Sequence, residues 1–560
     1  MTGPGPEAAI IGAATLARAN AGNYVGGLRG LWKDPRILYI ALFASLGGLI
    51  FGYQQAVLGQ AFVMHSFGRR FPEIANDAGA QGWLTAILQL SGWAGALVSG
   101  VTCEVLSRKR TIFGCCLWVI LGTYLTAGAS TGAYLYAGRF FTGIGVGALS
   151  AAGPLYNAEL APPEIRGLLI AMQQLAITIG IMIAYWITYG TNYIGGTGEG
   201  QSDWAWRLPL VIQGIPAIIL AIGIWFLPYS PRWLVKQGRI DDAVKSLARL
   251  RGADPTDQLI QIELLEIQAE CIFEKRVFRK NFPGLADKWE SNRWLQELGQ
   301  YAQIFRTKDA FKRVAIASLV MFFQQFSGID GVIYYTPIIF RSLGLTNSTT
   351  SLLATGITGV LNVLTTIPAV LVIDRVGRKP LLYCGSIGMM TTMIILAILV
   401  SQFQHDWVTH AAAGWGCVVM IWLYIINFAY SWGPVSWTLI AEVFSLSIRA
   451  KGTSIGASTQ WMLSFVIALV TPRMLESISW GMYVFFAGWL AAGMVFVYFF
   501  VPETKGKTLE EMDQVFGSKS STEDLAELAA VQEEVGLLRA MSGMNVSVDV
   551  SEKTSVREQD

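Results

Sequence analysis

The chain has 560 residues, of which 53% are hydrophobic and only 14% are charged, and its formal net charge is +2. A soluble domain carries about 25% charged residues, so this composition indicates an integral membrane protein. The small net charge gives no electrostatic reason to expect a nucleic-acid partner.

Twelve segments are apolar and long enough to cross a bilayer as helices, which need about 20 residues each. The first six are predicted at 37–62, 81–103, 111–131, 134–158, 168–189 and 208–228. The second six are predicted at 314–341, 350–373, 380–401, 412–441, 452–472 and 480–501. This division predicts an all-α membrane fold of two similar six-helix bundles, with the ligand between them.

The stretches outside the bundles are polar. Residues 230–313 cannot span a membrane and predict a linker of a few short surface helices. In the tail, apolar residues at 525, 528, 531, 535 and 538 have the spacing of an amphipathic helix. We therefore expect five regions: an N-terminal segment (1–36), a first bundle (37–229), the linker (230–313), a second bundle (314–501) and a C-terminal tail (502–560).

Lys and Arg are concentrated in the loops of one side, which holds Arg108-Lys109-Arg110, Arg378-Lys379 and the linker. Such loops face the cytoplasm in most membrane proteins. We expect both termini and the linker to be cytoplasmic, and the chain to be a multi-pass protein of the plasma membrane. An internal membrane stays open as an alternative.

The loop charges repeat between the two halves. Glu104 to Arg110 follows the second predicted helix, and Asp374 to Lys379 follows the eighth. Glu159 to Arg166 follows the fourth helix, and Glu442 to Arg449 follows the tenth with the same spacing. A single loop of this kind would be interpreted as balancing charges exposed to solvent. Because the acid–base pairs recur at equivalent positions in both halves, a structural role as a latch is favoured.

The segment Gln324-Gln325-Phe326-Ser327-Gly328-Ile329-Asp330 places two amides, a hydroxyl and a carboxylate inside an otherwise apolar stretch. Polar groups at membrane depth are costly unless they face a cavity or a partner. An amide both donates and accepts hydrogen bonds, which suits a ligand with many hydroxyls. The segment therefore predicts one wall of a polar ligand pocket.

Several motifs are specific in combination. They are Gly138-Arg139 with glycines at 143, 145 and 147, Pro154 to Glu159, Arg166-Gly167, Ser230 to Leu234, Gln324 to Gly328, Gly433-Pro434 with Trp437, and Pro502 to Gly506. On these motifs the chain, from about Tyr39 to Met512, resembles the sugar porter branch of the major facilitator superfamily, and its fungal members in particular. The resemblance implies a rocking carrier with one central sugar site.

The resemblance also implies roles for individual residues. The sugar site would be lined by Gln174, Gln324, Gln325, Asp330, Asn362, Trp437 and Gln460, with Ile177 and Phe428 as apolar wall. The outside gate would contain Phe51, Tyr334 and Tyr335. A cytoplasmic charge network would contain Glu104, Arg108, Glu159, Arg166, Asp374, Arg378, Glu442 and Arg449, and would join the two halves. Taken singly, an amide such as Gln174 or Asn362 fits equally well as a bond between helices.

One position departs from the family pattern. Proton-coupled members usually carry Asp after Phe-Gly-Tyr in the first helix, whereas this chain reads Phe51-Gly52-Tyr53-Gln54-Gln55. Gln54 cannot titrate, so Arg139, its expected neighbour, must bond amide or carbonyl oxygens. This favours facilitated diffusion over proton symport. Asp330 keeps symport open, because many members have Asn there and an acid in the site can carry a proton.

The predicted function is transport of a monosaccharide, a hexose or pentose, by alternating access. Alternatives are proton-coupled symport through Asp330 of a sugar, polyol, disaccharide or sugar acid, and a sugar sensor with little flux. No nucleophile–base, metal or phosphate-binding motif predicts an enzyme. The histidines, His65, His405 and His410, lack metal-ligand spacing. We expect no cofactor, no metal, and a monomer whose partners are the sugar and the lipid bilayer.

Overall fold

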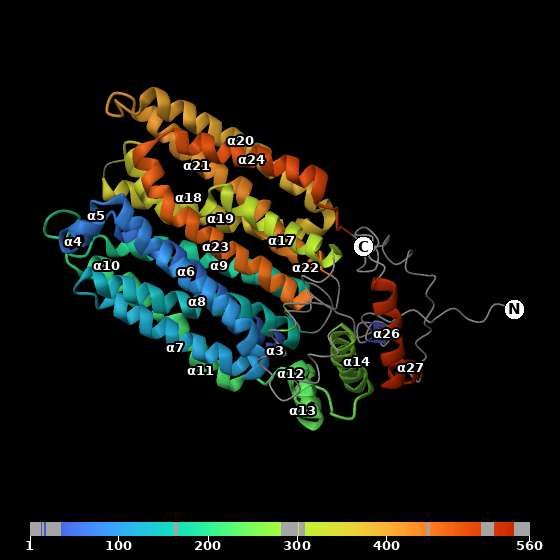
Figure 1. Cartoon of the computed structure of the whole chain (residues 1–560). Helices are drawn as coiled ribbons and strands as arrows, with labels where there is room; N and C mark the ends of the chain where they lie inside the picture. Colours follow the sequence, from blue (N-terminus) through green and yellow to red (C-terminus); the bar gives the residue numbers. More distant parts are fainter. Residues whose placement is uncertain are drawn as a thin grey trace.

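The computed structural model describes residues 13, 16–17, 35–161, 166–281, 299, 301, 308–345, 347–444, 449–505 and 520–542, and contains no strand within these ranges. Its long helices lie roughly side by side in one elongated body (Figure 1). The prediction of an all-α fold is confirmed.

The first half contains five long helices and a broken sixth. The long helices are α3 (Pro35–Ala61), α6 (Ala78–Val105), α7 (Arg108–Ala127), α8 (Gly132–Leu160) and α9 (Arg166–Thr191). The sixth consists of α10 (Trp204–Ile212), α11 (Gly214–Gly223) and a short 3-10 turn, Ile224–Phe226. Between α3 and α6 lie two short helices, α4 (His65–Arg70) and α5 (Pro72–Ala75).

The second half contains four long helices and two broken ones. The long helices are α19 (Ser348–Val376), α20 (Arg378–Phe403), α23 (Arg449–Ser477) and α24 (Gly481–Phe500). The broken ones are the pair α17 (Lys308–Phe326) and α18 (Ile329–Ser342), and the pair α21 (Ala411–Tyr430) and α22 (Trp432–Glu442).

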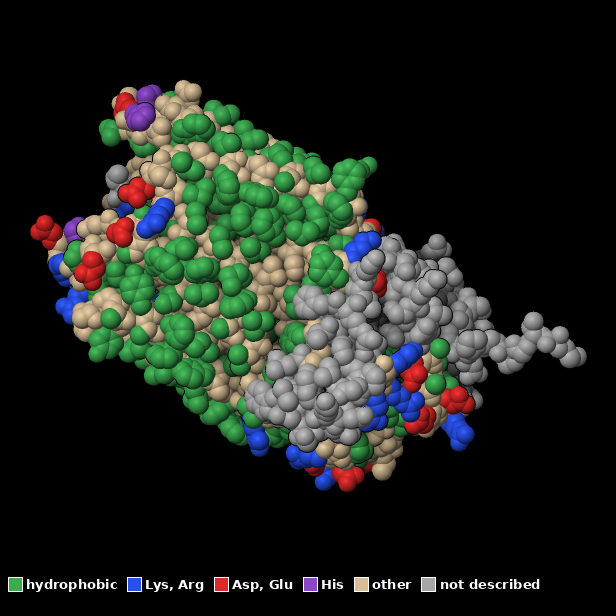
Figure 2. Space-filling view, in the orientation of Figure 1, with side chains coloured by type: hydrophobic (Ala, Val, Ile, Leu, Met, Phe, Trp, Pro, Cys, Tyr) green, Lys and Arg blue, Asp and Glu red, His purple; other side chains and the backbone are tan. Residues whose placement is uncertain are grey.

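Within the described residues, ten helical stretches are long and apolar enough to cross a membrane. They coincide with ten of the twelve predicted segments; the other two correspond to α3 and α8, which have 27 and 29 residues. Figure 2 shows hydrophobic side chains over the long flank of the body and charged side chains gathered at its ends. A bilayer requires this distribution, because lipid tails cannot solvate charge.

Two second-half spans break where the sequence places polar residues. Gly328, between α17 and α18, has φ +92°, a left-handed conformation that glycine adopts at little cost. A Cβ there would also lie 2.7 Å from the Phe486 ring. The other break is at Ser431, between α21 and α22. Each break frees backbone groups that need hydrogen bonds inside the membrane.

The two halves approach each other closely where glycines allow it. A Cβ at Gly82 on α6 would lie 2.6 Å from the Leu469 carbonyl oxygen on α23. A Cβ at Gly59 on α3 would lie 1.7 Å from the Tyr334 carbonyl oxygen on α18. These glycines therefore set the spacing between helices of different halves, as small residues do in membrane helix packing.

The linker forms α12 (Pro231–Lys236), α13 (Ile240–Arg251) and α14 (Gln258–Asn281). Helices were predicted here, but α14, with 24 residues, is not short. The three linker helices lie at one end of the body, the linker end, while α4 and α5 lie at the other (Figure 1). Trp233 Nε1 donates to the Glu104 carbonyl oxygen at 2.9 Å, which fixes α12 to the end of α6.

The predicted tail helix is present as α26 (Ser520–Glu534) and α27 (Leu537–Ser542). It packs beside α14 (Figure 1), where Leu528 contacts a cluster with Phe273 and Val277. Arg276 on α14 forms ion pairs with Glu527, at 3.4 Å, and with Glu534. The apolar face of the tail is thus buried on the linker.

Glu274 on α14 binds two cations of α12, Lys236 at 3.0 Å and Arg232. Burial acts to raise the pKa of Glu274, but the charges of Lys236 and Arg232 outweigh it and lower the pKa from 4.5 to about 2. The stabilisation is therefore present above pH 4.5 and is lost as the pH falls toward 2. We expect Glu274→Gln to lower the melting temperature of the purified protein at neutral pH, with a gap to wild type that closes upon acidification. A gap independent of pH would contradict this assignment.

Candidate functional site

Gln324 connects the two broken spans of the second half. Its Nε2 donates to the Trp432 carbonyl oxygen at 2.9 Å, at the start of α22. Tyr424 on α21 donates to the Ser327 carbonyl oxygen at 2.9 Å, so both breaks are satisfied by side chains of the opposite span. The amide nitrogen of Gln324 therefore has a structural role, which leaves its oxygen for other partners.

Three of the predicted site amides have a buried side-chain oxygen with no hydrogen-bond partner among the described residues: Gln324, Gln325 and Gln460. Their side chains are at most 5% exposed. A buried polar atom without a partner costs about 1–3 kcal/mol, so such atoms mark places where water or a ligand supplies the missing bond. These three oxygens can all accept hydrogen bonds from hydroxyl groups.

Asp330 and Tyr334 lie at the centre of a polar cluster that joins the halves, the Tyr334 cluster. The Tyr334 hydroxyl accepts from Gln55 Nε2 at 3.2 Å and from Gln89 Nε2 at 2.8 Å, both in the first half. It donates to Asp330 Oδ2 at 3.1 Å, and Ser464 on α23 donates to the same oxygen. All five side chains are buried.

The three predicted gate residues do not lie together. Tyr334 and Tyr335 are adjacent on α18, and the Tyr335 hydroxyl donates to the Ala468 carbonyl oxygen at 2.7 Å. Phe51 instead contacts Trp461 of α23, with 5.0 Å between ring centroids, in a separate hydrophobic cluster whose other members belong to the first half and the linker. The structure therefore separates Phe51 from the two tyrosines, because it lies two turns before Gly59, where α3 meets Tyr334.

The remaining predicted site residues come from four helices. Gln174 and Ile177 are half-buried on α9, and Asn362 is buried on α19. Phe428 is buried at the end of α21, and Trp437 is half-buried on α22. These side chains take no part in the hydrogen bonds of Gln324 or of the Tyr334 cluster.

Arg139 and Gln54 are in contact, as the sequence predicts. Arg139 Nη1 donates to Gln54 Oε1 at 3.3 Å and to the Gln54 carbonyl oxygen at 3.4 Å. Both side chains are at most 2% exposed. Among the described residues, no carboxylate lies within salt-bridge distance of Arg139.

The charge network of the first half is assembled at the linker end. Arg108, 1% exposed, binds Glu104 at 2.6 Å and Glu159 at 2.8 Å. Lys236 of the linker binds Glu104 at 3.4 Å. Ser230 donates to the second oxygen of Glu159, which joins the loop after the sixth span to the same network.

The second half repeats this arrangement. Arg378 binds Glu442 at 2.6 Å, and Thr504 donates to Glu442 at 2.6 Å. Glu503 accepts the backbone N–H groups of Arg378 and Lys379 at the start of α20. The side chains of three predicted members, Arg166, Asp374 and Arg449, lie outside the described residues.

The pairs that the structure describes among the predicted members lie within one half: Arg108 pairs with Glu104 and Glu159, and Arg378 pairs with Glu442. The reason is chain proximity: each acid lies on a helix that packs beside the arginine's own helix. The described pairs therefore fasten helices within each half. The joining of the two halves by the network stays a prediction, because its other three members have side chains outside the described residues.

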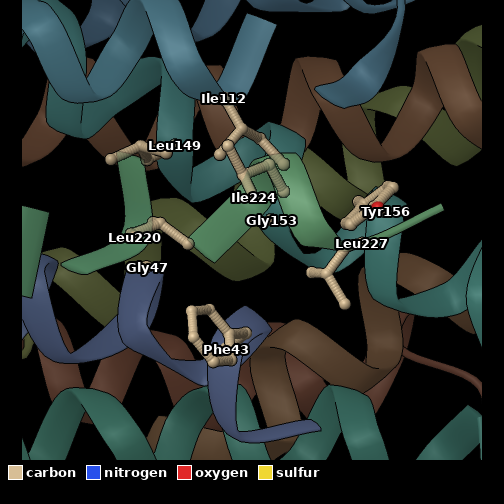
Figure 3. A pocket seen from close by; sticks show the side chains of 9 residues that line it. All are labelled: Phe43, Gly47, Ile112, Leu149, Gly153, Tyr156, Leu220, Ile224 and Leu227. Carbon is tan, nitrogen blue, oxygen red and sulfur yellow. The ribbon is translucent and has the colours of Figure 1, made fainter. Parts of the chain in front are cut away.

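A small apolar pocket lies elsewhere in the first half (Figure 3). It is lined by Phe43, Gly47, Ile112, Leu149, Gly153, Tyr156, Leu220, Ile224 and Leu227. None of the predicted sugar-site residues lines it, and its apolar lining cannot satisfy hydroxyl groups. It is therefore distinct from the polar site.

Sequence reasoning missed Gln55, Gln89 and Ser464 of the Tyr334 cluster, and Trp461, whose Nε1 donates to Ser150 of the first half at 3.0 Å. Two signals were available. Gln89 is an amide within an apolar span, and Ser464 lies four residues after Gln460, on the same helix face. These signals mark the residues as polar, but the sequence contains no local signal for the distant helices in which their hydrogen-bond partners lie.

Two six-span halves, broken spans and buried polar groups between the halves define a membrane transporter of the major facilitator fold. Residues 40–516 match the family described as "Sugar (and other) transporter". The chain belongs to this sugar porter family, and it is a transporter and not an enzyme.

Curated relatives cover most of the chain. Sugar transport protein 13 of Arabidopsis thaliana is 33% identical over 498 residues, which are 86% of this chain and 89% of that protein. A quinate permease of Neurospora africana is 31% identical over 501 residues, covering 87% and 89%. High-affinity glucose transporter 1 of Candida albicans is 31% identical over 499 residues, covering 86% of each.

Solved structures give the same fold. The xylose transporter XylE from E. coli, in a partially occluded inward-open conformation, matches with a TM-score of 0.68 at 26% identity, covering 85% of this chain and all of XylE. XylE, described as a proton:xylose symporter and bound to 6-bromo-6-deoxy-D-glucose, also matches at 0.68, with 27% identity and 86% and 99% coverage.

Proposed function

We propose that this chain carries a neutral monosaccharide, a hexose or a pentose, by alternating access between its two halves. The observation that supports this most is the set of buried, partnerless amide oxygens of Gln324, Gln325 and Gln460. Sugar hydroxyls would donate to these acceptors and remove their desolvation cost. Gln174, Asn362 and Trp437 would complete the site, with Ile177 and Phe428 as apolar wall.

The charge of the site argues against an acidic substrate such as quinate. Asp330 accepts from Tyr334 and Ser464, and the partnerless side-chain oxygens of the three glutamines can only accept hydrogen bonds. A ligand carboxylate is only an acceptor, so it would face the carboxylate of Asp330 and the oxygens without a donor. A neutral polyol avoids this repulsion.

The test is competition for uptake of labelled glucose in cells that lack their own hexose carriers. Unlabelled glucose and xylose are expected to compete, and quinate is not. If quinate competes better than either sugar, the neutral-sugar proposal fails. If none of the three competes and no glucose enters, the monosaccharide assignment fails and the sensor alternative gains support.

We infer that transport is facilitated diffusion. Arg139 bonds the amide of Gln54, which cannot gain or lose a proton, so protonation has no direct means of releasing the arginine at this position. The conformational change then needs no proton, and sugar binding alone shifts the equilibrium between states.

Gln54→Asp is expected to introduce proton dependence, because an aspartate beside Arg139 would form an ion pair that protonation breaks. Uptake by this variant should become sensitive to a protonophore and to external pH. Gln54→Asn is the matched control and should remain insensitive. Wild-type uptake that already collapses with the protonophore would contradict the inference.

A second candidate mechanism is symport with the proton carried by Asp330. Its described hydrogen bonds come from hydroxyl groups, and no described cation lies within salt-bridge distance. A buried carboxyl group without a cation can hold a proton. Under this mechanism Asp330→Asn would abolish accumulation of sugar against a gradient but would retain equilibrating uptake.

We further propose that the linker end faces the cytoplasm, with both termini on that side, and that the protein functions as a monomer in the plasma membrane. The proposed regions are those expected from the sequence: residues 1–36, 37–229, 230–313, 314–501 and 502–560. The basic loops at Arg108–Arg110 and Arg378–Lys379 support this orientation. Impermeant labelling of a tag on the tail only after permeabilisation would agree with it, and labelling of intact cells would reverse it.

A further inference from the structure

Tyr301, a linker residue that precedes α17, lies between helices of the two halves at the linker end. Its hydroxyl is 3.2 Å from Ser454 Oγ on α23, in the second half. On the other side, a Cβ added to Gly100 of α6 would lie 2.5 Å from the Tyr301 hydroxyl oxygen. Tyr301 therefore contacts a first-half helix and a second-half helix at the same time.

The Tyr301 ring is held by the second half. Lys451 Nζ lies 5.1 Å from the ring centroid, a cation–π distance. The ring also packs against a cluster formed by Ala310, Val314, Ala317, Met321, Ile440 and Phe444. With the ring fixed there, its hydroxyl reaches toward α6, and only a residue without Cβ at position 100 leaves room for it.

We propose that Tyr301 is a positioning residue for transport: it stabilises the conformations in which the linker ends of α6 and α23 are together. This inference rests on the proposed alternating access, in which those ends separate and meet again in each cycle. When they separate, the contacts with Ser454 and Lys451 stay within the second half, while the contact with Gly100 is lost. A contact made in one state and not in the other shifts the balance between states.

Gly100 and Tyr301 offer a pair of substitutions that compensate for each other when combined. Gly100→Ala adds a methyl group where the Tyr301 hydroxyl lies, and overpacking of this kind is destabilising. Tyr301→Phe removes that oxygen, so the double variant has room for the methyl group again. Gly100→Ala is therefore expected to favour the open linker end, and adding Tyr301→Phe to restore the wild-type balance.

The readout is the alkylation rate of a cysteine placed at Ser458, in a variant whose six native cysteines are serine. Ser458 is 7% exposed and lies one turn after Ser454, on the same face of α23. In inside-out membranes, Gly100→Ala should raise the rate roughly fivefold or more. Tyr301→Phe in the same chain should return it close to the starting value.

Gly114→Ala on α7 is the matched control, because nothing lies within 4 Å of a Cβ there, and it should leave the rate unchanged. If Gly100→Ala has no effect, or if Tyr301→Phe does not reverse it, the role of Tyr301 is wrong. If the rate in the starting chain does not respond to transported sugar at all, alternating access itself is wrong, which separates the two failures.

Discussion

Arg108→Ala is expected to destabilise the carrier by about 3–5 kcal/mol, the cost of leaving buried charges without their partner. Arg108 is 1% exposed and binds both Glu104 and Glu159. Its Nη1 also donates to the Cys103 carbonyl oxygen at 3.1 Å, so its loss opens the junction of α6, α7 and α8. Fluorescence-detected size-exclusion chromatography after heating should show little folded carrier compared with wild type.

Arg110→Ala is the matched control, because Arg110 lies two residues further along α7 and its side chain is exposed. An exposed charge contributes about 0–1 kcal/mol, so this variant should behave as wild type. Equal stability of the Arg108 and Arg110 variants would show that the network contributes no more than surface charge.

Gln325→Ala is expected to weaken sugar binding by about 1–3 kcal/mol, which is roughly five- to 150-fold in dissociation constant. Gln325 is 2% exposed and its Oε1 has no partner among the described residues. If a sugar hydroxyl supplies that partner, the alanine variant leaves the hydroxyl buried and unbonded. Isothermal titration of the purified carrier with glucose measures the change.

Gln213→Ala provides the comparison that separates ligand binding from helix packing. Gln213 is also a buried membrane amide with a partnerless oxygen, but its Nε2 donates to Thr123 within the first half at 3.1 Å. Its replacement should lower thermal stability and leave glucose affinity unchanged. Equal losses of affinity in both variants would mean that Gln325 acts through the fold and does not contact the sugar.

The sequence alone was sufficient for features that depend on local composition. Apolar length located the spans, and the spacing of apolar residues located the tail helix now seen as α26 and α27. The contact between Arg139 and Gln54 was also predictable, because a buried guanidinium needs an acceptor and Gln54 offers one.

Features that depend on contacts between distant helices were not predictable. The amides of Gln55 and Gln89 meet Tyr334 across the interface between the halves, at sequence separations of 279 and 245 residues. The sequence shows that an amide lies within an apolar span, but it does not show which distant helix that amide faces. The same limit explains the charge network, where an acid-to-arginine spacing cannot distinguish pairing within a half from pairing between halves.

The measurement that tests the central claim most directly is the steady-state ratio of internal to external labelled glucose in cells without other hexose carriers, with and without a protonophore. A carrier for a neutral sugar by facilitated diffusion predicts entry that stops at a ratio of about one and is unchanged by the protonophore. Accumulation well above one that collapses when the proton gradient is removed would contradict this account and would assign proton coupling to Asp330.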